Sequence, residues 1–84
     1  MKTFEIQQTE TYENNQDNSK TNVTCLRCGK DVKNIRYEVE CIDGGAYALA
    51  TKYEADINDS GYMGFYAIGS DCKKHIPSEF IHKR

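Results

Sequence analysis

Two pairs of potential metal ligands lie far apart in the sequence. Cys25 and Cys28 are separated by two residues and followed by Gly29, and Cys72 and His75 are again separated by two residues. Three thiolates and one imidazole form a complete tetrahedral ligand set for zinc, and four protein ligands leave no position for a reactive water. The spacing therefore predicts one structural zinc ion bound by Cys25, Cys28, Cys72 and His75, and it argues against an enzyme.

Cys41 is the alternative to His75 as the fourth ligand. It falls on the apolar face of a predicted strand, where a free cysteine usually packs as a small hydrophobic residue. Cys72 and His75 are three residues apart, so in a helix they would share one face and could chelate a common ion. We favour His75 on this spacing and keep Cys41 as the alternative.

The size of the chain explains why a metal is expected. With 84 residues and 38% hydrophobic residues, the sequence predicts one domain with a small core. Such domains often depend on a metal or on disulfides. The sequence has no apolar signal-peptide run near its start and no apolar stretch of the roughly 20 residues that cross a bilayer. We therefore expect a cytoplasmic protein whose cysteines stay reduced and bind zinc.

Hydrophobic periodicity predicts a small α+β fold. Alternating apolar residues predict antiparallel strands over residues 35–41, 46–53 and 62–68, with a hairpin turn between the first two. Ser70 or Asp71 is the expected N-cap of a short C-terminal helix.

The polar N-terminal part is expected to lie outside this domain. Residues 1–22 are predicted to form a polar arm or loop with a possible edge strand over residues 3–9, and this arm is either disordered or folded against the sheet or a partner. Residues 23–84 are predicted to form the single-zinc domain.

The order of these features resembles a known structural arrangement. A Cys-x2-Cys-Gly-Lys opening at residues 25–30, a tyrosine-rich strand at residues 62–68 and a closing Gly-Ser-Asp-Cys-x2-His resemble the treble clef. They also resemble small zinc-ribbon-like proteins with a single zinc, common in phages and mobile elements. The resemblance covers residues 23–76 and implies a zinc-stabilised interaction module.

Basic residues flank both ligand pairs, although the net charge is −2. The candidates for contact with a partner are Arg27, Lys30, Lys33, Lys73 and Lys74. These residues either compensate the negative charge of a zinc–thiolate centre or form a binding surface, and the sequence leaves both readings open.

Three functions follow from these features. We expect first a non-enzymatic zinc-binding module that binds a protein partner, with no membrane contact and no small-molecule substrate. The first alternative is a zinc domain that binds nucleic acid through the basic residues. The second is a phage-type inhibitor of a host defence nuclease, suggested by the acidic residues of the predicted sheet.

Overall fold

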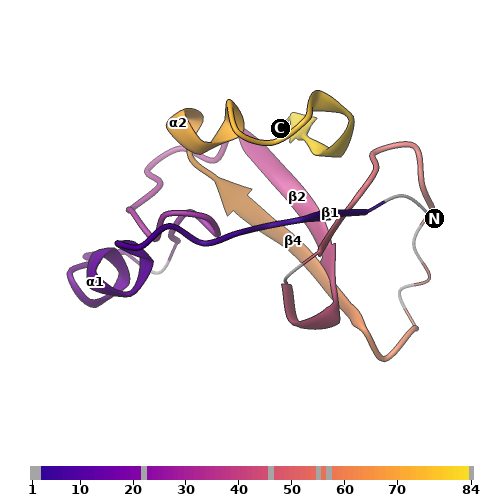
Figure 1. The fold of residues 1–84 in the computed structure, drawn as a ribbon, viewed down its shortest axis with the longest axis horizontal. Coiled ribbons are helices and arrows are strands. Elements are labelled where there is room, and N and C mark those ends of the chain that lie inside the picture. Colours follow the sequence, from indigo (N-terminus) through magenta and orange to yellow (C-terminus); the bar gives the residue numbers. More distant parts are fainter. Residues whose placement is uncertain (1–2, 22, 46, 55, 57, 84) are drawn as a thin grey trace.

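A five-stranded antiparallel sheet with two short helices forms the fold in a computed structural model, which describes residues 3–21, 23–45, 47–54, 56 and 58–83 (Figure 1). The elements are β1 (Thr3–Glu5), α1 (Tyr12–Asp17), β2 (Tyr37–Ile42), η1 (Asp43–Gly45), β3 (Tyr47–Leu49), β4 (Tyr62–Ile68), α2 (Ser70–Lys73), η2 (Ser78–Phe80) and β5 (His82–Lys83). The predicted α+β class is confirmed, since the chain combines an antiparallel sheet with short helices.

Strand β2 is the centre of the sheet. The strand order is β1-β3-β2-β4, and the short β5 also pairs with β2. Strands β2 and β4 pair from Tyr37 opposite Ile68 to Ile42 opposite Tyr62. The register shifts next to Gly64, which has a φ of +85°, and the strand has a bulge there, as a glycine inside a strand favours.

One face of the sheet carries the hydrophobic core. Val39 and Cys41 of β2 point to this face with none of their surface exposed, and Ile68 of β4 joins them. The segment after α2 covers the face: Phe80 is 1% exposed and its ring packs against the ring of Phe4 at 5.6 Å. The position predicted for Cys41 on the apolar face is therefore confirmed.

The N-terminal residues are folded against the rest of the chain. Strand β1 pairs with β3, with Phe4 opposite Ala48, at the expected edge of the sheet. The stretch predicted as a flexible arm or loop contains α1, which buries none of its own residues. Polar contacts hold it: Asn15 donates from Nδ2 to the carbonyl of Cys28 at 2.8 Å, and Gln16 donates to Thr24 at 3.0 Å.

Several predicted elements have other bounds in the structure. The edge strand expected over residues 3–9 is β1 alone, and the strand expected over residues 35–41 is β2, which begins at Tyr37. The strand expected over residues 46–53 is β3 alone, because Tyr53 closes a turn on the carbonyl of Ala50 and the backbone of Thr51 bonds to Glu79. Ala46, like the arm residue Asn22, lies outside the described residues. Helix α2 has one turn, and its N-cap is Gly69, one residue before the expected cap.

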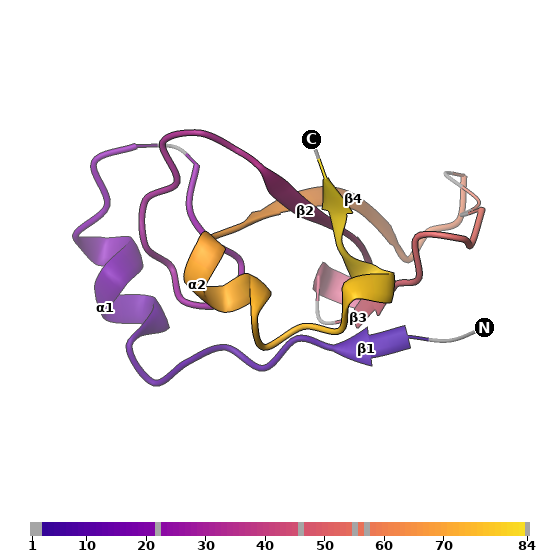
Figure 2. The ribbon, with the colours of Figure 1, turned by 90° about the horizontal axis from the view of Figure 1, so that it is seen from above.

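Helices α1 and α2 lie toward the same end of the long axis. Figures 1 and 2 show α1 beside the start of α2 at one end, and the connection from β3 to β4 at the other. Of the described residues, none belongs to a helix with the length and apolar character needed to cross a membrane.

Candidate metal centre

The first ligand pair lies in a tight backbone turn. The N–H of Cys25 donates to the carbonyl of Lys30, and the N–H of Gly29 donates to the carbonyl of Cys25, both at 2.9 Å. Gly29 has a φ of +78°, a conformation that side chains disfavour. A Cβ atom there would also lie 2.5 Å from the backbone oxygen of Tyr12, so glycine is required both by the turn and by the close approach of α1.

The sheet brings the second pair to this turn. The N–H of Leu26 donates to the carbonyl of Ala67 at 3.0 Å, which fixes the turn to the last residues of β4. Helix α2 starts two residues after β4 ends, and its first turn contains Cys72. The pairing of β4 with β2 therefore delivers Cys72 to Cys25 and Cys28, although 43 residues lie between Cys28 and Cys72 in the sequence.

The three sulfur atoms form a cluster that could hold a metal ion. The Sγ atoms of Cys25, Cys28 and Cys72 all lie within 4.8 Å of one another. Tetrahedral zinc with Zn–S bonds of about 2.3 Å requires sulfur atoms about 3.8 Å apart, so small rotations of the side chains suffice to bind. Cys25 and Cys72 are buried, at 1% and 3% exposure, and Cys28 is half-buried.

Backbone donors favour a thiolate at Cys25. Burial alone raises the pKa of this thiol, but N–H groups of Gly69, Cys28 and Arg27 point at its sulfur and bring the pKa below its ordinary value. Burial raises the pKa of Cys72 to about 12, and the adjacent Cys25 contributes to the rise. In the metal-free chain Cys25 therefore ionises before Cys72, and a bound cation would favour the thiolate form of its ligands.

His75 lies outside the sulfur cluster. Its backbone N–H bonds to the carbonyl of Cys72 at 3.0 Å, but α2 ends at Lys73 and the imidazole is exposed. The ring lines a separate hollow of about 450 Å³ together with Phe4 and Arg27. The structure thus brings together three of the four predicted ligands, and no other histidine, cysteine or acidic residue among those described joins them.

Cys41 does not replace His75. Its sulfur is fully buried in the core, 3.8 Å from the carbonyl of Val39, and it is not part of the cluster. Burial, with a contribution from Glu40, raises the pKa of Cys41 to about 12. This thiol therefore behaves as the small hydrophobic residue that its strand position suggested.

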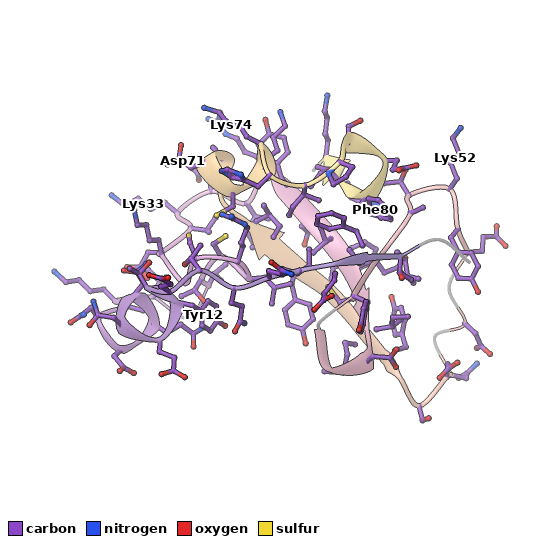
Figure 3. All side chains as sticks on the ribbon, in the orientation of Figure 1. Tyr12, Lys33, Lys52, Asp71, Lys74 and Phe80 are labelled. Carbon is purple, nitrogen blue, oxygen red and sulfur yellow. The ribbon has the colours of Figure 1, made fainter. Side chains whose placement is uncertain are left out.

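The basic residues are divided among different sides of the centre. The Nη1 atom of Arg27 lies 3.5 Å from the Sγ atom of Cys72, so the guanidinium of Arg27 faces the cluster directly. Lys30 lines the hollow that contains the three sulfurs. Lys73 and Lys74 line another hollow, and Lys73 also lies 4.5 Å from the centre of the Tyr37 ring. Figure 3 shows Lys33 on the side of α1, extending away from the sheet.

Two groups at the centre were not identified from the sequence. Gly69 supplies a backbone donor to Cys25, and a Cβ atom at this position would lie 3.7 Å from the sulfur of Cys25; its place three residues before Cys72 was the available signal. Asp31 accepts from the hydroxyl groups of Ser19 and Thr21 and from the backbone of Lys20, which closes the loop after α1 onto the turn. No sequence pattern indicated that contact.

Comparisons with models of protein families, with functionally curated proteins and with solved structures gave no significant match.

Proposed function

We propose that this chain is a non-enzymatic interaction module in which one zinc ion joins the Cys25–Cys28 turn to the start of α2. The cluster of three sulfur atoms within 4.8 Å carries the proposal. Thiolate ligands favour zinc among the abundant divalent cations of the cell, and the three-sulfur set disfavours magnesium and calcium. A turn with two cysteines, an antiparallel sheet and a cysteine in the first turn of a helix also support the treble-clef-like arrangement.

A zinc ion bound by Cys72 would hold α2 in place, and with it one wall of a basic groove. A hollow of about 430 Å³ lies beside α2, with the lysine side chains Lys73, Lys74 and Lys83 around it. The buried side chains of Ile76 and Ile81 line it as well, and none of the described residues that line it is acidic. Lys73 follows the ligand Cys72 directly, so the position of α2 determines the position of this wall.

The chemistry of the groove fits an acidic protein segment. Three ammonium groups complement carboxylates, and an aliphatic floor accepts an aliphatic side chain. Single-stranded nucleic acid usually stacks its bases on exposed aromatic rings, but the lining of this groove has none, and Lys73 covers the ring of Tyr37. We therefore favour a protein partner over nucleic acid.

Metal analysis tests the first part of the proposal. The full chain, purified without chelator, is expected to contain about one zinc per molecule, and the triple variant Cys25→Ser/Cys28→Ser/Cys72→Ser none. Zinc that remains in the triple variant would contradict the proposed centre.

Peptide binding tests the second part. The probe is a fluorescein-labelled dodecapeptide of glutamate and leucine, compared with a twelve-nucleotide single-stranded DNA at low salt. We expect Lys74→Glu/Lys83→Glu to weaken peptide binding about 10-fold. The control Lys33→Glu/Lys52→Glu has the same change in net charge at exposed sites outside the groove, and we expect less than a twofold effect. Equal losses in both variants, or tighter binding of the DNA than of the peptide, would refute a groove for acidic protein segments.

A further inference from the structure

The outer edge of β4 is open. Strand β4 lies at the end of the strand order, and β2 is its only partner among the described strands. The carbonyl of Ala67 accepts from the N–H of Leu26 at 3.0 Å, so the backbone of Ala67 faces away from β2. Backbone groups alternate between the two sides of an antiparallel strand, so the N–H and carbonyl of Phe65 face the same open side. No described residue bonds to either group there.

This edge lacks the side chains that usually protect an edge strand. Natural edge strands often carry charged residues or proline, but residues 60–70 contain neither. Instead the strand exposes two large apolar side chains, Met63 at 42% and Phe65 at 50%. The bulge beside Gly64 interrupts the regular strand, so only a short stretch of the edge can pair with another strand.

A mostly apolar hollow of about 360 Å³ borders the same edge. It shares no residue with the hollow at the three sulfurs or with the basic groove. Glu38 is the only charged residue among the described residues that line it, and the acidic residues of α1 are not part of the lining. The lining consists of Tyr12, Gln16, Val23, Thr24, Leu26, Ile35, Glu38, Phe65, Tyr66 and Ala67. The hollow therefore suits an apolar side chain.

Opposite charges lie at the two ends of β4. Residues 32–37, which line the hollow through Ile35, contain the exposed Lys33 and Arg36 and no acidic residue. Residues 54–60, which lead into β4, contain three acidic residues and no basic one: Glu54, Asp56 and Asp59. Strands of an antiparallel pair run in opposite directions. A second copy paired at this edge would therefore bring its acidic segment toward the basic segment of the first.

We infer that the outer edge of β4 pairs with β4 of a second copy of this chain, antiparallel, about a two-fold axis at Phe65. The N–H of Phe65 in each copy donates to the carbonyl of Phe65 in the other. In this register Met63 of one copy lies opposite Ala67 of the other, beside the hollow, which receives the flexible thioether side chain. The turn at Leu26, which already occupies the carbonyl of Ala67, ends the pairing there.

The dimer is expected to be weak. The pairing has few backbone hydrogen bonds and a small apolar contact, and small interfaces of this kind belong to transient complexes. We expect a Kd on the order of 100 µM. Sedimentation velocity of the full chain from about 10 µM to 1 mM should show the mean mass rise from monomer toward dimer. A chain that remains a monomer at 1 mM would overturn the inference.

A substitution at Met63 tests the position of the interface. Met63 is preferred to Phe65, whose ring also packs against His82 at 5.1 Å. Met63→Glu is expected to weaken the dimer at least 10-fold, because it places a carboxylate at an apolar hollow that contains Glu38. The control Tyr47→Glu makes the same change in charge at a side chain that is 37% exposed on β3, and we expect less than a twofold effect. Circular dichroism checks that both variants are folded.

Charge variants test the direction of the pairing. Lys33→Glu/Arg36→Glu is expected to weaken the dimer roughly 3- to 10-fold. The pair Lys74→Glu/Lys83→Glu, in the basic groove, has the same change in net charge and should have less than a twofold effect. Equal weakening by both pairs, or by Met63→Glu and Tyr47→Glu, would overturn the antiparallel contact at β4. A dimer that dissociates only with the groove variant would place the interface beside α2 instead and would equally overturn it.

Discussion

Replacement of Cys72 by serine would remove the sulfur that connects α2 to the turn at Cys25 and Cys28. Helix α2 contains four residues, which is too short to be stable without tertiary contacts. We expect Cys72→Ser to abolish stoichiometric zinc binding and to loosen the segment from Ser70 onward. The two remaining thiolates belong to one turn and cannot join separate elements.

The expected size of the effect follows from mass action. A chain of 84 residues has a free energy of unfolding of roughly 4–13 kcal/mol. Zinc present at about 1,000 times its Kd contributes about 4 kcal/mol of that stability. Loss of the metal should therefore remove a third or more of the free energy of unfolding, which is far above the error of a denaturant titration.

Urea unfolding followed by circular dichroism measures this difference. EDTA is expected to lower the midpoint of the wild type to about that of Cys72→Ser and to leave the midpoint of the variant unchanged. Cys41→Ser is the matched control: it should retain one zinc and the response to EDTA, and lose about 1–3 kcal/mol because a hydroxyl replaces a fully buried thiol. Loss of zinc from Cys41→Ser, or retention of one zinc by Cys72→Ser, would refute the assignment of the ligands.

Three further substitutions test the surroundings of the centre. Gly29→Ala should destabilise the fold and weaken metal binding, whereas Gly44→Ala, at the same φ of +78° but with free space around it, should cost only about 1 kcal/mol; equal costs by urea unfolding would contradict the close approach of α1. Asp31 has a pKa below 3.8 because it accepts from Ser19 and neighbouring loop donors, so its ionised form stabilises the fold above about pH 4. Asp31→Asn should therefore lower the unfolding midpoint at pH 7, and the difference from the wild type should close as the pH falls through the pKa of the folded state; a difference that does not vary with pH would argue against this contact. Phe80→Ala should cost about 3–5 kcal/mol with the zinc content unchanged, and a loss of zinc would show that the core and the metal centre are not separable.

Local sequence patterns predicted much of the sheet. The range predicted for β4, residues 62–68, matches the structure, and a glycine inside a strand, here Gly64, favours the bulge found beside it. Both signals are local, since alternation and backbone freedom depend on neighbouring residues. β3 was predicted too long because its end is set by a distant contact, from the backbone of Thr51 to Glu79.

The expected position of His75 depended on a helix that does not extend far enough. Helix α2 ends at Lys73, and one further turn follows, in which the N–H of His75 bonds to the carbonyl of Cys72. The exposed imidazole of His75 nevertheless lies outside the cluster of the three sulfurs. The contact between Arg27 and the sulfur of Cys72 is also absent from any local pattern, because it joins residues 45 positions apart. Three cysteines were predicted from their types and spacing, but the completion of the coordination sphere depends on tertiary structure.

Helix α1 contacts the turn that contains Cys25 and Cys28. Its residues are polar and show no apolar period, so the sequence indicated a loop, yet Asn15 bonds to the carbonyl of Cys28, and the backbone of Tyr12 leaves no room for a side chain at Gly29. The turn that carries two of the ligands is therefore held between α1 on one side and α2 on the other. A metal ion bound there would stabilise the turn conformation that α1 contacts, as well as the position of α2. Removal of the metal should consequently loosen residues 9–21 together with residues 70–76, although no residue of α1 is a ligand.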